Sequence, residues 1–198
     1  MRLAALAALL IAVAVLCGGW GGIQLGGSAQ TQTFVSLFTT EFGADNGNSA
    51  DFEIGVLFTI DSAVSPGGGY VHGVKFHKQP LNTGTHVAHL WEVTGAVLHR
   101  TETFVDETAG ANDATGWQSQ LFTTQGSYKV DPDTEYIVSY TNNKNYSFTA
   151  SGLAAGLTVS PIVVPSGSPA RWNATLSTFP SSSNGHNYWI DVIWSETP

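Results

Sequence analysis

Large apolar residues recur at every second position along much of this chain. The clearest example is residues 52–60, where the apolar side chains on one face of an extended backbone are Phe52, Ile54, Val56, Phe58 and Ile60. This alternation predicts a β-strand with one face in a hydrophobic core. Similar runs between turn residues predict seven further strands, at residues 70–77, 87–93, 96–104, 117–123, 135–141, 157–164 and 188–194.

Turn-forming residues separate these runs, as at Ser65-Pro66-Gly67-Gly68-Gly69 and Asp131-Pro132-Asp133. Beyond the N-terminal segment, no stretch shows a convincing helical period. Short strands without alternating helices favour an all-β fold, and we expect an antiparallel β-sandwich of jelly-roll type. A closed barrel is the alternative. We expect residues 43–50 and 165–185 to be irregular surface loops.

The N-terminal segment has a different composition from the rest. Met1-Arg2 provides a positive start, residues 4–17 are apolar, and small residues end the segment at Ala29. This pattern predicts a signal peptide, residues 1–29, followed by a single β-sandwich domain, residues 30–198, that is secreted or displayed at the cell surface. The alternatives are a retained membrane anchor and a lipid on Cys17, although Leu16 before it disfavours lipid attachment. After removal of the leader we expect no membrane contact.

Charge and cysteine content exclude several kinds of function. The formal net charge is −8 and the few basic residues are scattered, so nucleic acid is not an expected partner. Cys17 is the only cysteine and lies in the predicted leader. The mature domain is therefore expected to have no disulfide, no thiolate metal site and no cysteine nucleophile.

The sequence also lacks the common catalytic and cofactor-binding motifs, so we expect a non-enzymatic protein without a cofactor. Calcium is the best candidate among metals, because Asp45, Asp51 and Glu53 lie in one acidic stretch. The favoured interpretation is that these acids are solvated loop residues, and we predict no metal site. His86 and His89 would point to opposite faces of a strand, which does not favour a shared metal ion.

Tryptophans and tyrosines are plentiful and could stack against sugars. In the last predicted strand Trp189 and Asp191 share one face. This would place a flat indole ring beside a carboxylate acceptor, and a pyranose needs both an apolar surface and a hydrogen-bond acceptor. The alternative is that Trp189 packs beneath a loop. The core face of that strand is expected to carry Tyr188, Ile190, Val192 and Trp194. The candidate ligand-binding residues are Trp91, Trp117, Trp189, Asp191 and His86.

Several stretches, in order and spacing, resemble the domain-of-unknown-function-4082 family. The resemblance covers residues 34–194. It is carried most specifically by Asn82-Thr83-Gly84-Thr85-His86, Gly116-Trp117-Gln118 and Asn187-Tyr188-Trp189-Ile190-Asp191-Val192. The sequence departs from the family pattern at residues 152–174, where Ala, Val, Pro and Ser replace an aromatic and Gly-rich segment. A ligand site built there is therefore not expected.

The resemblance implies an extracellular β-sandwich module of bacterial surface proteins, with carbohydrate as the suspected ligand. We therefore expect a secreted, non-catalytic module that binds a glycan or a cell-surface polymer, or that mediates adhesion. The alternative is a structural protein whose sandwich assembles with copies of itself in a surface layer or filament, with the segment after Ala29 as a swapped strand.

Overall fold

A computed structural model describes residues 32–198, and the predicted signal peptide and Cys17 lie outside the described residues. Within residues 32–198 the only helical element is the short 3-10 helix η1 (Ala114–Gly116), and every other regular element is a strand. The strands are β1 (Ala44–Asp45), β2 (Asp51–Ile60), β3 (Gly69–His77), β4 (Val87–Glu92), β5 (Val97–Thr103), β6 (Trp117–Leu121), β7 (Tyr128–Val130), β8 (Tyr136–Asn143), β9 (Ser147–Phe148), β10 (Leu157–Val159), β11 (Ile162–Val164), β12 (Ala170–Asn173), β13 (Ser182–Asn184) and β14 (Ile190–Ser195).

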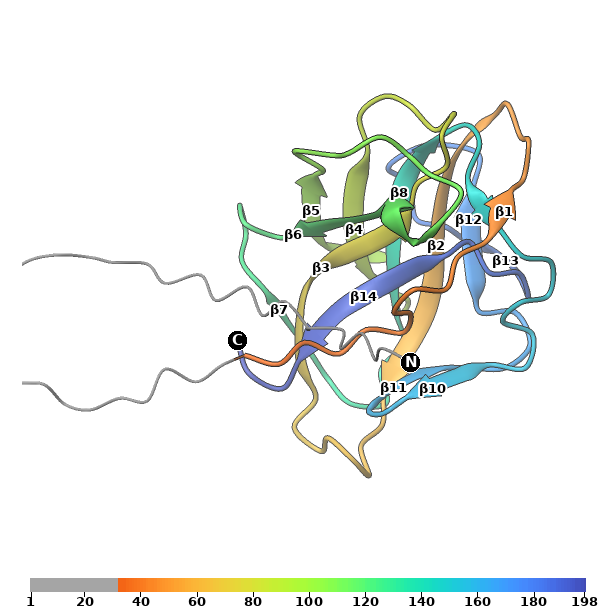
Figure 1. Ribbon diagram of the computed structural model, residues 1–198. Helices are drawn as coiled ribbons and strands as arrows, with labels where there is room; N and C mark the ends of the chain where they lie inside the picture. Colours follow the sequence, from red (N-terminus) through yellow and green to blue (C-terminus); the bar gives the residue numbers. More distant parts are fainter. Residues whose placement is uncertain (1–31) are drawn as a thin grey trace, which may run out of the picture. The chain divides into compact units, whose positions relative to one another are not determined.

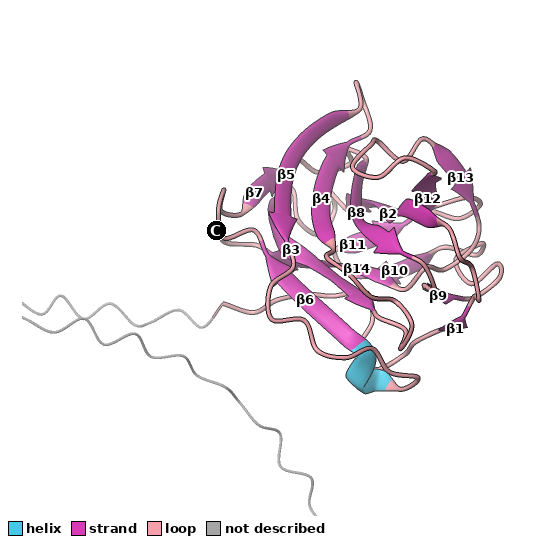
Figure 2. Cartoon of the chain, turned by 90° about the horizontal axis from the view of Figure 1, so that it is seen from above, coloured by secondary structure: helices cyan, strands magenta, loops and turns pink. Residues whose placement is uncertain are grey.

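The strands form two main antiparallel sheets and one small pair (Figures 1 and 2). The larger sheet has the order β10-β11-β2-β8-β4-β5, and β12 also pairs with β2 and carries β13 on its other side. The smaller sheet has the order β14-β3-β6, with β7 also on β3, while β1 pairs with β9. The expected antiparallel all-β sandwich is confirmed. The jelly-roll connectivity stays a prediction.

The core lies between the two main sheets, and β2 supplies much of it. The expected face of β2 is confirmed, because Ile54, Val56, Phe58 and Ile60 are buried in one cluster and Phe52 packs against it. The same cluster contains residues of β3 and β14, which belong to the smaller sheet. The alternation of β2 was visible in the sequence because the apolar side chains of one of its faces lie in the core.

Two predictions about the C-terminal third were wrong. Residues 157–164 form not one strand but the hairpin of β10 and β11, which turns at Ser160-Pro161. Residues 165–185 are not irregular throughout, since they contain β12 and β13. The sequence of β12, Ala170-Arg171-Trp172-Asn173, is too short and too polar to indicate a strand by itself. It becomes one because its backbone pairs with Glu53–Val56 of β2.

The predicted loop at residues 43–50 contains the two-residue strand β1, which pairs with β9. Before it, the chain runs beside β14, where Val35 and Trp194 exchange both backbone hydrogen bonds, at 2.7 and 3.1 Å (Figure 1). We call residues 36–43 the N-terminal strap. Within residues 32–198, no helix is long and apolar enough to span a membrane.

Candidate functional site

Trp91 does not offer an exposed surface for a ligand. Its side chain is only 5% exposed and packs with Leu57 and Ile137 in a second small core on the outer face of the larger sheet. Its indole N–H donates to Ser139 Oγ at 2.8 Å. Phe179, from the connection after β12, covers Trp91 in an edge-to-face contact. The proposed role of Trp91 in sugar stacking is therefore corrected, because a loop lies over it.

Asp191 is fully buried, which corrects the expected pairing of an exposed Trp189 with an available acceptor. One carboxylate oxygen accepts the Leu37 N–H at 2.7 Å, and the other accepts the Phe38 N–H at 2.9 Å. The Ser36 hydroxyl donates at 2.7 Å, and Lys75 Nζ lies 3.0 Å away. The carboxylate thus holds the N-terminal strap on the smaller sheet, and its lone pairs are already used within the protein.

Trp117 and Trp189 lie partly exposed on either side of the strap. Both contact Phe38, with ring centroids 6.1 Å from Trp117 and 4.9 Å from Trp189. The Trp117 indole donates to the Glu41 carbonyl at 3.0 Å, and Trp189 Nε1 donates to Thr149 Oγ1 at 3.0 Å. Each indole N–H is thus used to hold a neighbouring segment. Trp189 also has a left-handed φ of 54° and precedes β14, so it falls outside the strand alternation expected for it.

A cavity of about 370 Å³ lies beside Trp189 and is lined mainly by apolar side chains, among them Leu37, Leu153 and Leu157. Glu41 is one of its lining residues. Hydrogen bonds from the backbone N–H groups of Glu41 itself, Thr39 and Thr40 lower the pKa of the Glu41 carboxyl to about 2. The cavity's other polar lining residues are Thr149 and Asn187, and an oxygen of each already accepts a hydrogen bond from Trp189.

His86 is also buried, so it is not available for the ligand contact that the sequence suggested. Its Nδ1 lies 2.8 Å from Glu107 Oε2, which also pairs with Lys78 at 2.7 Å, and its Nε2 lies 2.8 Å from Asn82 Oδ1. A hydrogen bond between the first and last residues of the motif Asn82-Thr83-Gly84-Thr85-His86 therefore closes this turn. These contacts give the motif a structural role.

The three candidate calcium ligands are not brought together. Asp45 and Asp51 are exposed, whereas Glu53 is fully buried on the outer face of β2. Glu53 Oε1 lies 2.9 Å from His89 Nδ1, and Glu53 Oε2 accepts the Ser177 N–H at 3.1 Å. Among residues 32–198, no group of three His, Cys, Asp or Glu residues could hold a metal ion. The acidic stretch is divided because β2 begins within it.

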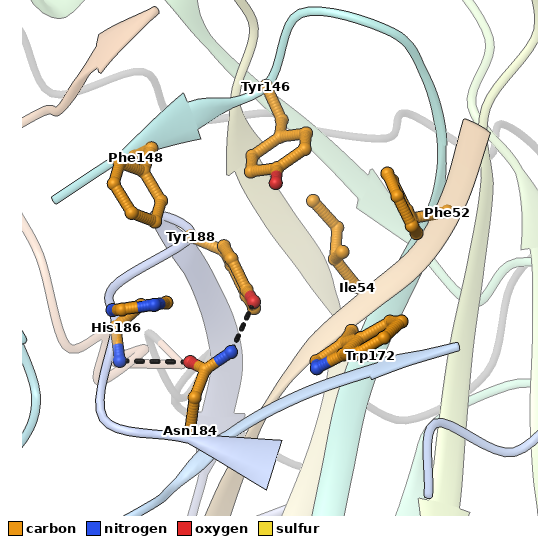
Figure 3. A pocket seen from close by; sticks show the side chains of 8 residues that line it. All are labelled: Phe52, Ile54, Tyr146, Phe148, Trp172, Asn184, His186 and Tyr188. Atoms are coloured by element: carbon orange, nitrogen blue, oxygen red, sulfur yellow. Dashed lines mark hydrogen bonds between the residues drawn. The ribbon is translucent and has the colours of Figure 1, made fainter. Parts of the chain in front are cut away.

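An aromatic pocket at one end of the sandwich is the strongest candidate for a ligand site (Figure 3). Its volume is about 330 Å³, at the lower end of the range of small-molecule sites. Five of its lining residues come from strands, and the others come from the connections before β9 and β14. The lining is Phe52, Ile54, Tyr146, Phe148, Trp172, Asn184, His186 and Tyr188.

The register of the larger sheet explains why the pocket forms there. Trp172 of β12 lies opposite Ile54 of β2 and opposite Ser182 of β13, so these residues share the inner face of the sheet. At this end, Tyr146 and Tyr188 from connecting segments cover the inner face in place of a strand of the smaller sheet. Bulky rings on irregular segments do not fill the space as interdigitating strands do, and a cavity is left between them.

The rings around the pocket meet edge to face. Centroid distances are 5.8 Å between Phe52 and Trp172, 6.2 Å between Phe52 and Tyr146, and 5.4 Å between Tyr146 and Tyr188. The corresponding interplanar angles are 84°, 88° and 86°. This is a favoured geometry for aromatic pairs, and it holds the walls in place without a bound ligand.

A small hydrogen-bond network forms the polar side of the pocket. Asn184 Nδ2 donates to the Tyr188 hydroxyl at 2.7 Å, and Asn184 Oδ1 accepts the His186 backbone N–H at 3.0 Å. The Ser151 N–H donates to His186 Nδ1 at 3.1 Å, so in a neutral His186 ring the proton lies on Nε2. Asn184 and His186 are thus oriented before any ligand arrives.

Burial raises the pKa of the Tyr188 hydroxyl to about 12, although the hydrogen bond from Asn184 opposes this shift. We therefore expect Tyr188 to stay neutral in the folded protein well above pH 10. Because the folded pKa exceeds the unfolded value, its contribution to stability is complete below about pH 10 and is lost as the pH rises towards 12. An ultraviolet titration of phenolate, with Tyr188→Phe to assign the step that belongs to Tyr188, measures this. Ionisation of Tyr188 near pH 10 would contradict it.

Sequence reasoning missed every aromatic residue of this pocket as a site residue. Tyr146 and Phe148 lie next to an Asn-rich turn, and Trp172 lies in the segment where no ligand site was expected. A usable signal was the presence of large aromatic residues within otherwise small and polar stretches. Such residues are costly to leave exposed and have no alternation to place them in the core, so they indicate a binding surface or a loop contact.

The described residues thus form an antiparallel β-sandwich with an aromatic pocket at one end. The family model described as Domain of unknown function (DUF4082) matches residues 39–190, and the chain belongs to this family. The family expected from the sequence motifs is confirmed. None of the curated proteins compared with the chain matches it.

Proposed function

We propose that this protein is a secreted, non-catalytic module that binds a carbohydrate in the aromatic pocket. The observation that carries the proposal is the pairing, in one cavity, of aromatic walls with an ordered amide and hydroxyl network. A pyranose has apolar C–H faces and an edge of hydroxyls, and these two surfaces are what such a pocket complements. The site differs from the one expected around Trp189 and Asp191.

A binding role suits this pocket better than a hydrolytic one. Glycoside hydrolysis commonly requires two carboxyl groups on either side of the scissile bond. The eight lining residues include no Asp or Glu. The secreted location rests on the sequence of residues 1–29, which has the features of a signal peptide.

Trp172 is the residue whose replacement tests the proposal most directly. We expect Trp172→Ala to weaken glycan binding by at least about tenfold, equivalent to about 1.4 kcal/mol, because it removes the largest wall of the pocket. The wild-type affinity is expected to be weak, since few atoms are buried and the desolvation of hydroxyls offsets much of the gain. A glycan array followed by calorimetric titration provides the measurement.

The matched control is Phe42→Ala, which removes an exposed aromatic side chain outside the pocket. This variant should bind as the wild type does. Thermal unfolding of both variants separates loss of the site from loss of the fold. Equal binding by wild type and Trp172→Ala would show that the glycan binds outside the aromatic pocket. Absence of binding to any glycan would overturn the proposal.

Self-assembly is the second candidate function. It is favoured by exposed apolar side chains on or next to β5 and β6: Val97, Leu98, Val105 and Leu121. Two features of β5 oppose strand addition at its edge. The Thr101 N–H is bonded to Gln125, and the Arg100 guanidinium is bonded to the carbonyls of Gly126 and Ser127. Size-exclusion chromatography with light scattering over a range of concentrations tests this candidate, which requires oligomers.

A further inference from the structure

We infer that the aromatic pocket selects an uncharged pyranose, which stacks on Trp172 and accepts hydrogen bonds from the pocket's N–H and O–H groups. This inference rests on the proposed function and specifies its ligand. The alternatives for an aromatic pocket of this size are an acidic sugar and a quaternary ammonium group, which aromatic cages also bind. The charge of the pocket's side chains and the direction of its hydrogen bonds distinguish these three classes of ligand.

The absence of charged side chains argues against an acidic sugar. Among the described residues that line the pocket there is no Lys or Arg. Elsewhere Lys75 is paired with Asp191 and Lys78 with Glu107, and Arg171 of β12 donates to the Ser168 carbonyl. A carboxylate taken from water into the pocket would have no cation to compensate its desolvation. The net charge of −8 adds a further unfavourable term.

The polarity of the hydrogen-bonding groups argues against a cation. Within residues 32–198, no hydrogen bond involves Trp172 Nε1–H, and the His186 ring is bonded through Nδ1 and not through Nε2. The Tyr188 hydroxyl accepts from Asn184, which leaves its own proton to donate. In Figure 3 the Tyr146 hydroxyl points toward the middle of the pocket, and the Trp172 nitrogen and the Tyr188 hydroxyl lie on the side of Asn184. Donors present their positive ends, and these repel a quaternary ammonium group.

A neutral sugar satisfies both conditions. Its hydroxyl, ring and acetamido oxygens accept hydrogen bonds. Its C–H face packs on an indole, and no charged group has to be removed from water. Asn184 and His186 are held in place by bonds to Tyr188 and Ser151, so little side-chain entropy is lost when the sugar binds. The pocket is thus organised for a neutral ligand rich in acceptors.

The test is an NMR titration of the whole purified protein, in which the indole N–H signal of Trp172 reports binding. The probes are methyl glycosides of neutral hexoses and N-acetylhexosamines, methyl glucuronide, sialic acid and choline. We expect only the neutral glycosides to shift the Trp172 signal. Preference for an acidic sugar in the pocket overturns this inference and leaves the proposed function standing. Binding of choline, or no binding at all, overturns both.

Two conservative variants test the donors separately from the walls. Trp172→Phe and His186→Phe keep an aromatic wall and remove one N–H donor each. Each should weaken binding of a neutral glycoside by about fivefold, as expected for one lost hydrogen bond. Phe42→Ala again serves as the control. Because Trp172→Phe lacks the indole N–H, shifts in the amide spectrum measure the affinity of each variant, and the same spectrum shows whether the fold is retained. Unchanged affinity in both Phe variants would show that the donors do not contact the ligand and would overturn their assignment.

Discussion

Replacement of Phe58 by Ala is expected to lower the free energy of unfolding by about 3–5 kcal/mol. Phe58 lies near the C-terminal end of β2, is fully buried, and packs against Tyr136 with ring centroids 6.1 Å apart. The loss combines the transfer energy of the ring with a cavity that the surrounding sheets cannot fill. Chemical denaturation, with the slope compared between wild type and variant, gives the value.

Leu121→Ala is the control for this experiment. Leu121 lies in β6 and is exposed, so its replacement should change the free energy of unfolding by no more than about 0.5 kcal/mol. A loss below about 1 kcal/mol for Phe58→Ala would mean that β2 does not contribute its apolar face to the core. That result would be inconsistent with the alternation of β2.

Asp191→Asn is expected to cost about 3–5 kcal/mol, as found when one partner of a buried ion pair is removed. The variant leaves the Lys75 ammonium, whose side chain is 15% exposed, without its carboxylate. It also places an amide N–H₂ group among the backbone donors of Leu37 and Phe38. Because those two residues belong to the N-terminal strap, their amide protons should exchange with solvent faster in the variant.

The control for Asp191→Asn is Asp51→Asn, an exposed acid at the start of β2, which should stay within about 0.5 kcal/mol of wild type. A double variant, Lys75→Met with Asp191→Asn, should recover part of the loss, since it leaves no unpaired buried charge. If the exchange of the Leu37 and Phe38 amides is unchanged in Asp191→Asn, the carboxylate does not hold the strap.

Phe58 and Asp191 differ in how far the sequence alone indicates their role in the fold. Phe58 could be assigned to the core from the pattern around it. Asp191 was taken as a ligand-binding acceptor, because alternation within a strand shows which residues share a face but not what covers that face. The strap that covers it lies 153 to 155 residues earlier in the chain. Such a long-range contact leaves no local signal in the sequence.

The same reasoning applies to the tryptophans. Trp91, Trp117 and Trp189 were candidates because tryptophan serves well both in binding and in packing, and composition does not separate the two roles. The structure separates them by their neighbours: a loop covers Trp91, and the strap and Thr149 engage the indole N–H groups of Trp117 and Trp189. Trp172 is the tryptophan whose ring lines the aromatic pocket.

The sequence by itself determined the all-β class, the family, the core face of β2 and the positions of most long strands. These properties depend on side-chain periodicity and on turn residues, which are local. Only the tertiary structure decided that residues 170–173 and 182–184 are strands, that Asp191 is a buried anchor, and that Phe52, Tyr146, Trp172 and Tyr188 surround one pocket. Each of these depends on which distant segment pairs with or covers another, because strand pairing and burial are set by contacts across the fold.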